Sequence, residues 1–324
     1  MATVLVTGVG GASGTGAVRA LCETTTHDIV GVDMDADAAG LYLADAGQAI
    51  PPADAEEWGP RLRAVVDDYG VDVVVPTVDE ELSELDALPD DVPVVAPRPG
   101  VIETALDKYA THRTLAAAGH DLPRTWLASE AAAVPEDAYP LIRKPRRGRG
   151  SRGVERVETP ADLERSLRES ERPAEQVLFQ ECIEGTEFTT SVVSTADDRL
   201  LSVVPKEAIE KQGSTVKGVT RDQAAVREAC RDIAATLSPA GPMNVQQIVA
   251  DDGTPYTIEI NPRFSSTACL TVEAGVNELD LLIRDALGEP VSAPEGYESG
   301  VYFLRYDTHV FVDRDQYRSR AGES

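Results

Sequence analysis

The residues with the clearest chemical pattern lie between positions 244 and 263. An Asp-Gly pair at 252–253, flanked by apolar runs, predicts a tight turn between two antiparallel strands. Glu259 and Asn261 are two residues apart, so both point to one face of the second strand, and Gln246 on the first strand can lie beside them. Such a set of oxygen ligands, with one formal negative charge, suits Mg²⁺, or Mn²⁺ as the alternative ion, when substrate phosphates complete the coordination. An exposed amphipathic hairpin without a ligand is the other interpretation.

A loop rich in glycine and arginine follows a short predicted strand at 141–144. Residues 145–153 contain four arginines, although the formal net charge of the chain is −26. Backbone N–H groups of such a loop can donate to phosphate oxygens. Lys144, one of only five lysines in the chain, ends the strand and offers a compact charge for a phosphate. The pattern predicts an anionic ligand rather than a solvated charged turn, and we expect Lys211 to contribute far less to its binding.

Two weaker segments flank the loop. Asp107-Lys108 precedes a Gly-x-x-x-Pro turn at 119–123, and residues 177–189 read Val-Leu-Phe-Gln-Glu-Cys-Ile-Glu-Gly-Thr-Glu-Phe-Thr. In their order along the chain, these segments, the loop and the Glu-x-Asn-Pro-Arg hairpin resemble the ATP-grasp superfamily. The likeness is greatest to the synthetase halves of carbamoyl-phosphate synthase and their single-domain relatives, and it covers about residues 1–290.

The resemblance implies that these segments bind MgATP together. Lys108 and Lys144 would neutralise phosphate oxygens while residues 146–153 close over the triphosphate. The nucleotide-binding residues implied in this way are Lys108, Lys144, Gly148, Gly150, Ser151, Gly153, Gln180 at the exocyclic amine of adenine, Glu181 and Ile183 at the adenine edge, and Glu187 at the ribose. The implied metal ligands are Gln246, Glu259 and Asn261, and the implied catalytic residues that offset charge during phosphoryl transfer are Arg263 and Lys144.

The reaction implied by the resemblance is ADP-forming ligation of a small carboxylate to an amine, a thiol or a similar nucleophile, through an acyl-phosphate. Two departures limit the likeness. The run Ser265-Ser266-Thr267 stands where the synthase halves carry a further basic residue, which puts bicarbonate chemistry in doubt. The 324 residues also show a single grasp unit and no glutaminase domain, so we do not expect a complete carbamoyl-phosphate synthase.

The elements that would position these residues follow from hydrophobic periodicity. Predicted strands at 3–7, 28–33, 71–76 and 92–96 alternate with helices, which is typical of a doubly wound parallel sheet. Residues 1–100 are therefore expected to form a Rossmann-like domain that precedes the grasp domain.

The rest of the chain is predicted to be an α+β domain and a short extension. Residues 101–290 would form a two-subdomain ATP-grasp domain that opens with a helix at about 101–118. Residues 291–324 are expected to pack on it, with a β-like stretch at 300–312 and a polar, frayed end at 313–324.

A glycine-rich turn at 8–16 offers a different function. It follows a strand, opens a helix and precedes Asp33, which is close to a dinucleotide-binding fingerprint. An NAD-dependent oxidoreductase or epimerase is therefore an alternative, although the Tyr-x-x-x-Lys pair of such enzymes is missing. We expect instead a tight turn that touches the second substrate. The acidic run at 79–81 follows another strand and either borders the cleft or begins a helix, where the helix dipole favours acids.

Composition narrows the function further. There are 56 acidic and 30 basic residues, spread along the chain, which is typical of proteins adapted to high salt. An acidic docking surface for a basic partner is the alternative. Nucleic-acid binding is not expected without a basic face, and neither a signal peptide nor a membrane-spanning run is predicted. We expect a cytoplasmic enzyme with small-molecule substrates. A homodimer is compatible with the sequence, and a catalytically silent ATP-binding regulator is the remaining alternative function.

Overall fold

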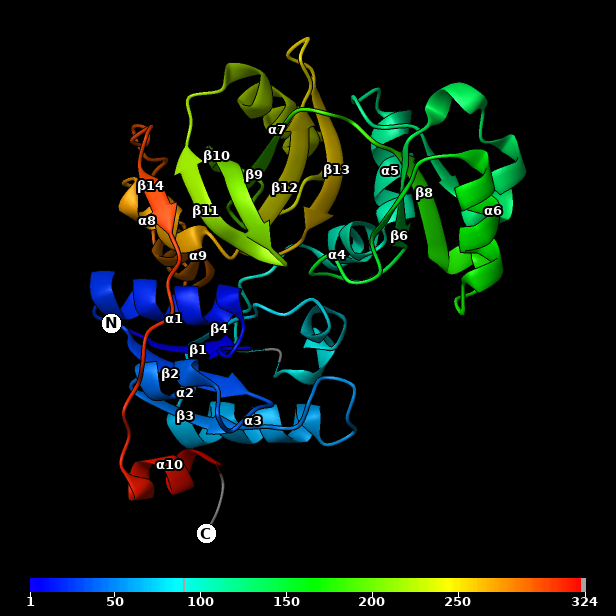
Figure 1. Ribbon diagram of the computed structural model, residues 1–324. Coiled ribbons are helices and arrows are strands. Elements are labelled where there is room, and N and C mark those ends of the chain that lie inside the picture. Colours follow the sequence, from blue (N-terminus) through cyan, green and yellow to red (C-terminus); the bar gives the residue numbers. More distant parts are fainter. Residues whose placement is uncertain (90, 322–324) are drawn as a thin grey trace.

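A computed structural model describes residues 1–89 and 91–321 (Figure 1). These residues form three β-sheets. We call the parts built on them the N-terminal unit (β1–β4), the small-sheet unit (β5–β8) and the large-sheet unit (β9–β14). The sheet of the N-terminal unit is parallel, and the other two are antiparallel. The predicted α/β class, with a parallel sheet first and an α+β region after it, is confirmed.

The N-terminal unit has the strand order β3-β2-β1-β4. Val4 packs in the cluster that includes α1, whereas Leu5 packs in the cluster that includes α3. Because successive strand residues face opposite ways, helices cover both faces, as in a doubly wound fold. The strand predicted at 92–96 is reduced to one bridge between Val74 and Val94. The elements are β1 (Thr3–Thr7), α1 (Ala12–Thr24), β2 (Asp28–Asp33), α2 (Ala39–Leu43), β3 (Ala46–Ala49), α3 (Trp58–Tyr69) and β4 (Val73–Val75), followed by 3₁₀ turns Glu81–Ser83 and Leu85–Ala87.

The small-sheet unit has the strand order β5-β8-β6-β7. The single helix predicted at 101–118 is divided at Asp107, whose backbone is extended. The Asp107 carboxylate accepts hydrogen bonds from the amides of Tyr109 and Ala110 and so caps a second helix. The elements are α4 (Pro99–Leu106), α5 (Lys108–Ala117), β5 (Thr125–Leu127), β6 (Leu141–Pro145), β7 (Glu155–Val157), α6 (Pro160–Glu169) and β8 (Val177–Glu181), with 3₁₀ turns Ala128–Ala133, Glu136–Ala138 and Ala174–Gln176.

The large-sheet unit has the strand order β13-β12-β9-β10-β11-β14. Helix α7 covers one face, where Cys230 and Ile233 pack with Val192 and Val245. Helices α8 and α9 lie between this sheet and α1 of the N-terminal unit (Figure 1). The elements are β9 (Thr186–Ser194), β10 (Leu200–Gln212), β11 (Ser214–Thr220), α7 (Ala224–Leu237), β12 (Pro242–Val249), β13 (Pro255–Asn261), α8 (Ala268–Glu273), α9 (Glu278–Ala286) and β14 (Tyr302–Leu304).

The C-terminal end differs from the prediction. Of the stretch at 300–312, three residues form β14, and helix α10 (Arg314–Ala321) follows where a frayed end was expected. The ring of Tyr317 stacks on Tyr42 of the N-terminal unit, 6.2 Å between centroids. The prediction for 322–324 falls outside the described residues. In residues 1–89 and 91–321, every helix is too short or too polar to cross a bilayer.

Candidate active site

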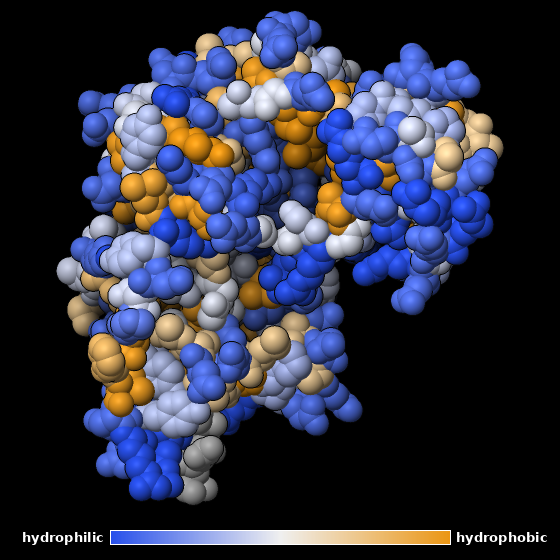
Figure 2. Space-filling view, viewed as in Figure 1, coloured by the Kyte–Doolittle hydropathy of each residue, from blue (hydrophilic) through white to orange (hydrophobic). Residues whose placement is uncertain are grey.

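Two adjoining cavities lie where the three units meet. The intersheet cavity, of about 940 Å³ with its open mouth, separates the small sheet from the large one. The first-loop cavity, of about 900 Å³ with its mouth, lies between the large sheet and the glycine turn after β1. Figure 2 shows the surface hollowed between the lobe on the right and the rest of the molecule. The residues that line both cavities are Arg149, Ser151, Glu187, Lys211, Gln246 and Glu259.

The structure brings nearly all the predicted site residues to these walls. One predicted glycine, Gly153, instead lies beside Pro145, where an added Cβ would come within 3.3 Å of the ring. Of the predicted residues, the intersheet cavity is lined by Lys108, Lys144, Gly148, Ser151, Gln180, Glu181, Ile183, Glu187, Gln246 and Glu259. The first-loop cavity adds Gly150, Asn261 and Arg263.

The hairpin of β12 and β13 presents the proposed metal ligands. Gln246 is paired directly with Glu259 in the ladder, so their side chains share a face. Asn261 lies two residues further along β13, on that face, and Lys108 Nζ is 3.4 Å from Glu259 Oε1. Within the described residues, no group of three or more His, Cys, Asp or Glu side chains could hold a metal. A metal in this cleft would therefore rest on a carboxylate and amide oxygens, a donor set that fits Mg²⁺.

Lys144 is buried at the back of the intersheet cavity, with 7 % of its surface exposed. Its ammonium donates to Gln180 Oε1 at 2.8 Å and to the Ile258 carbonyl at 2.9 Å. Burial lowers the pKa of Lys144 to about 8, partly opposed by the Glu259 carboxylate. The Gln180 amide nitrogen donates to Thr125 Oγ1 at 3.0 Å, so Gln180 holds Lys144 in place. One lone pair of the Gln180 side-chain oxygen remains available to accept a hydrogen bond from a ligand.

The glycine and arginine loop is anchored at its base and reaches the N-terminal unit at its tip. Arg146 Nε donates to both Asp107 carboxylate oxygens, at 2.8 and 2.9 Å. Lys108 Nζ donates to the Gly148 carbonyl at 2.5 Å. Arg149 forms an ion pair of 2.9 Å with Glu80. The loop thus spans the mouth of the cleft.

Lys211 is a site residue that sequence reasoning missed. It lines both cavities, and its ammonium lies 2.5 Å from Glu187 Oε1. Register shifts between Ala208 and Lys211 interrupt the pairing of β10 with β11, and such bulges re-aim side chains near active sites. Lys211 therefore lies in the cavity wall, although the sequence singled out only Lys144; that Lys211 contributes less to ligand binding stays a prediction. The rarity of lysine and the Gln-Gly-Ser turn at 212–214 were the available signals.

The glycine turn faces the first-loop cavity. Asp33 accepts hydrogen bonds from the backbone of Gly10 at 2.6 Å and of Asp35 at 2.9 Å. The carboxylate that a dinucleotide would need for its ribose is therefore engaged within the turn. Gly11, Ala12 and Ser13, at the start of α1, line the cavity instead. Gly11 carries no side chain that could cap this helix, so its first amides are available to an anion.

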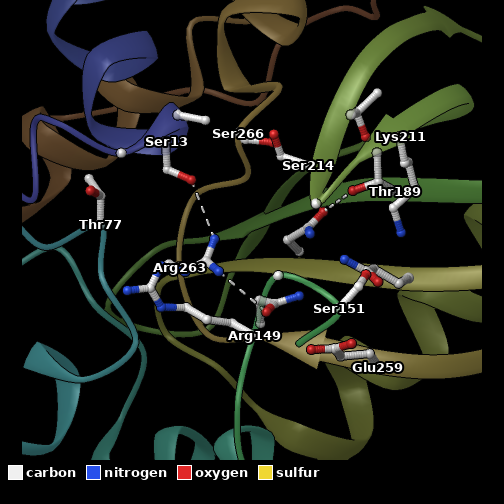
Figure 3. A pocket seen from close by; sticks show the side chains of 18 of the residues that line it. Ser13, Thr77, Arg149, Ser151, Thr189, Lys211, Ser214, Glu259, Arg263 and Ser266 are labelled. Atoms are coloured by element: carbon white, nitrogen blue, oxygen red, sulfur yellow. Dashed lines mark hydrogen bonds between the residues drawn. The ribbon is translucent and has the colours of Figure 1, made fainter. Parts of the chain in front are cut away.

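Arg263 connects the turn to the acidic run after β4. It is paired with Asp79 and lies 3.5 Å from Ser13 Oγ and 3.4 Å from Asn261 Oδ1 (Figure 3). Asp79 and Glu80 therefore border the cleft, one of the two roles predicted for the run at 79–81, and Glu81 begins a 3₁₀ turn. Glu81 is buried and accepts a hydrogen bond from Thr7. Burial raises the pKa of Glu81 to about 7, partly opposed by that bond.

Comparison with known protein families agrees with this architecture. The chain belongs to the ATP-grasp family, because the ATP-grasp domain matches residues 105–267, half of its length. The PylC-like N-terminal domain matches residues 4–93. The carbamoyl phosphate synthase large chain of Halobacterium salinarum is 31 % identical in an alignment of 193 residues that covers 53 % of this chain and 18 % of that protein. The chain thus spans about a fifth of the length of this relative.

Solved structures share the fold at low sequence identity. A biotin carboxylase complex with β,γ-ATP from Campylobacter jejuni has a TM-score of 0.75 and 18 % identity, covering 93 % of this chain and 74 % of that one. The L-amino acid ligase of Bacillus licheniformis has a TM-score of 0.69 and 19 % identity, covering 90 % and 75 %. At these identities the likeness establishes the fold.

Proposed function

We propose that the protein is an ADP-forming ligase that joins a small carboxylate to an amine, a thiol or a similar nucleophile at the expense of ATP. The observation that carries the proposal is the shared wall of the two cavities. Glu259, Gln246 and Lys211 stand between a cavity that holds Lys144 and a cavity that holds Arg263. Two substrates placed on either side of this wall would meet at its charged groups.

In this proposal the intersheet cavity binds ATP. The backbone at 181–183 receives the adenine edge, and Gln180 adds an acceptor for its amine. Lys108 and Lys144 place two positive charges at the phosphates. Lys144 suits this role because burial without a carboxylate contact lowers its pKa, and a phosphate anion would relieve that penalty. Glu187 receives the ribose hydroxyls, and Lys211 bridges from it towards the second cavity.

Gln246, Glu259 and Asn261 would hold Mg²⁺. When bound, the ion would offset charge on the phosphate oxygens. The chain's own groups orient the reaction. Gln246 and Glu259 are fixed by strand pairing, and Asn261 is buried next to Arg263. Such rigid placement favours positioning and electrostatic stabilisation over side-chain nucleophilic catalysis.

The first-loop cavity would bind the carboxylate. Amides at the start of α1 and the Arg263 guanidinium orient it towards the shared wall. A carboxylate oxygen attacks the γ-phosphorus, the bond to the ADP oxygen breaks, and an acyl-phosphate forms. The nucleophile then attacks the acyl carbon, loses its proton and releases inorganic phosphate. Ser265 and Thr267 are buried and uncharged where the synthase halves have a basic residue, which favours an organic carboxylate over bicarbonate.

The test is a screen for acceptor-dependent ADP release. Amino acids and small carboxylates are offered with MgATP in high KCl, and ADP is measured by a coupled assay. We expect release that depends on both a carboxylate and a nucleophile and that Mn²⁺ sustains in place of Mg²⁺. ATP binding without ADP release from any acceptor would favour the regulatory alternative. Fluorescence titration with reduced nicotinamide nucleotide decides the oxidoreductase alternative. We also propose a cytoplasmic location, because the proposed reaction consumes ATP and small metabolites.

A further inference from the structure

The C-terminal segment contributes to the cleft, although it lies beyond residue 267, where the family match ends. We call residues 300–321 the strap. It adds β14 to the edge of the large sheet, descends past α1 and ends with α10 beneath β3 (Figure 1). Arg320 donates to the carbonyls of Ala44 and Asp45, which holds α10 on the N-terminal unit. The strap thus joins the two units that enclose the first-loop cavity.

Arg305 of the strap stands behind the wall of that cavity. Its Nη1 donates to Ser214 Oγ at 2.7 Å, and its Nη2 donates to the Ser266 carbonyl at 3.1 Å. Ser214 begins β11 and Ser266 follows β13, and both line the first-loop cavity. The guanidinium also lies 5.5 Å from the centre of the Phe303 ring. One arginine therefore connects two parts of the cavity wall that are far apart in sequence.

Within the part of the chain that the structure describes, the charge of Arg305 has no acidic counterpart, in contrast to Arg149 and Arg263 of the cleft. Arg149 is paired with Glu80, and Arg263 with Asp79. Within the described residues, no carboxylate lies within 4.0 Å of the Arg305 guanidinium. Burial lowers the pKa of Arg305, yet an arginine stays protonated in proteins. In a chain with 56 acidic and 30 basic residues, this half-buried cation is poised for an anion from outside.

Arg305 can act on a ligand through the hydroxyl of Ser214, and it positions Ser266 through the backbone. Ser214 Oγ accepts a hydrogen bond from Arg305, so its own proton is free to be donated into the cavity. Ser266 is held through its backbone carbonyl, which leaves its hydroxyl free for a ligand. A hydroxyl donor that is itself hydrogen-bonded by a guanidinium, as Ser214 is, forms a strong hydrogen bond to an anion. Figure 3 shows Ser214 and Ser266 on the far side of the cavity from Glu259.

We propose that Ser214, Ser266 and Arg305 form a subsite for a second negative group of the carboxylate substrate. The reacting carboxylate would lie at the Glu259 end, so the substrate would be a dianion, such as a dicarboxylate or a phosphorylated carboxylate. Arg305 is a positioning residue in this subsite, because it acts through the two serines. The substrate class rests on the ligase function proposed above, whereas the anion preference of the wall can be measured without it.

The first test measures that preference with a thiol reporter in the full chain. Ser266→Cys is made in a background with Cys22→Ser, Cys182→Ser and Cys269→Ala. It is labelled with anionic methanethiosulfonate ethylsulfonate and with the cationic ethyltrimethylammonium reagent. We expect Arg305→Gln to lower the ratio of anionic to cationic labelling rates about tenfold, the effect of one charge a few ångströms away. Arg305→Lys, which keeps the charge, should retain most of the ratio.

The matched control is Arg318→Gln, which removes the same charge from an exposed position of the strap. An unchanged ratio in Arg305→Gln, or an equal change in Arg318→Gln, overturns the subsite. If Arg305→Lys behaves like Arg305→Gln, the role of Arg305 is structural and the proposal fails. Thermal melts show that each variant is folded.

The second test compares isosteric acceptors in the ADP-release assay, glutarate against glutaramate and succinate against succinamate. We expect the dianions to have lower KM values and Arg305→Gln to raise their KM about tenfold with little effect on the KM of ATP. Acceptor-dependent ADP release from monocarboxylates alone, insensitive to Arg305→Gln, overturns the subsite and leaves the ligase standing. A charge-dependent labelling ratio without ADP release from any acceptor supports the subsite and contradicts the ligase.

Discussion

The two cavities share a wall, yet they are built in different ways. The intersheet cavity takes most of its polar groups from short contiguous motifs, such as β6 with its loop and the hinge at 180–183. The first-loop cavity collects side chains from the turn after β1, the run after β4, the β10–β11 hairpin and the segment that follows β13. A motif places a residue through local geometry, whereas the second cavity exists only after distant segments have packed together.

The difference extends to charge. The ammonium of Lys144 in the intersheet cavity donates hydrogen bonds to neutral partners, and burial lowers the pKa of Lys144. In the first-loop cavity, Arg263 is already paired with Asp79. A phosphate would therefore strengthen the interactions of Lys144, while an acceptor would compete with an existing ion pair. We expect nucleotide binding to depend more on single side chains than acceptor binding does.

Glu259 belongs to both cavities, so its loss should have the largest effect. Glu259→Gln removes the one carboxylate of the proposed metal set and should lower kcat for ADP release about a thousandfold, or about 4 kcal/mol. A coupled ADP assay at saturating ATP measures the change. Asp251→Asn, in the exposed turn of the same hairpin, is the control and should retain activity. Near-normal turnover by Glu259→Gln would remove its metal role.

Glu81 lies behind the first-loop cavity and should control stability. Its pKa is raised from 4.5 to about 7 by burial, so the folded state binds more protons than the unfolded state between these values. The free energy of unfolding should therefore fall as pH rises from about 4.5 to 7, by about 3 kcal/mol for this group. Glu81→Gln should lose this fall, and the exposed control Glu84→Gln should keep it. Denaturant titrations at pH 5 and pH 8 measure the fall in the free energy of unfolding. An equal fall in the wild type and in Glu81→Gln would contradict this role of Glu81.

Substitution of Lys144 tests the intersheet cavity through its affinity for ATP. Lys144→Met should weaken ATP binding about thirtyfold, or about 2 kcal/mol, because a charged hydrogen bond to phosphate is lost. Calorimetric titration with Mg²⁺ and a non-hydrolysable ATP analogue measures the change. The control is Lys217→Met, since Lys217 lies on β11 opposite Leu304; Lys211 is unsuitable because it lines both cavities. Similar affinities for Lys144→Met and Lys217→Met would refute the phosphate role.

The pH dependence of ATP binding sharpens the same assignment. Lys144, with a pKa of about 8, loses its proton above that pH in the free protein. ATP affinity should therefore fall up to about tenfold per pH unit above pH 8. The fall should vanish in Lys144→Met. An ATP affinity that stays level from pH 7.5 to 9.5 in the wild type would show that Lys144 is not the titrating group.

The same lowered pKa of Lys144 also affects stability. Between about pH 8 and 10.5 the unfolded state binds more protons than the folded state, so this group makes the free energy of unfolding rise with pH in that range.

The smallest expected effect is that of salt, which should raise the stability of the acidic protein but weaken ATP binding in the cationic cleft. The net charge of −26 repels itself over a Debye length of about 10 Å at 0.1 M salt and about 3 Å at 1 M. The melting temperature should rise by a few degrees, roughly 1–2 kcal/mol of stability, between 0.1 and 2 M KCl. ATP affinity should fall over the same range, and MgATP should stabilise most at low salt. Thermal melts with and without MgATP test this; a flat or falling melting temperature would favour the acidic docking surface.

Local patterns accounted for the parts of the fold that depend on neighbours in the chain. The Asp-Gly turn and the two-residue alternation predicted the β12–β13 hairpin, and Gln246 lies opposite Glu259 as expected. The alternation of strands and helices predicted the parallel sheet. Asp107 shows the limit of such patterns. Its helix is interrupted where the carboxylate also binds Arg146, 39 residues away, a contact that helical periodicity does not contain.

The amino-acid sequence by itself determined the class of fold and indicated many of the polar groups that line the intersheet cavity, because strand period, turn residues and glycine loops act over a few residues. Only the tertiary structure decided the position of Lys211, which a bulged hairpin brings to Glu187. It also decided the place of Arg305, which meets Ser214 and Ser266 across 91 and 39 positions. The physical reason is that such contacts come from the packing of whole units, and the charge of a side chain does not reveal which distant groups will surround it.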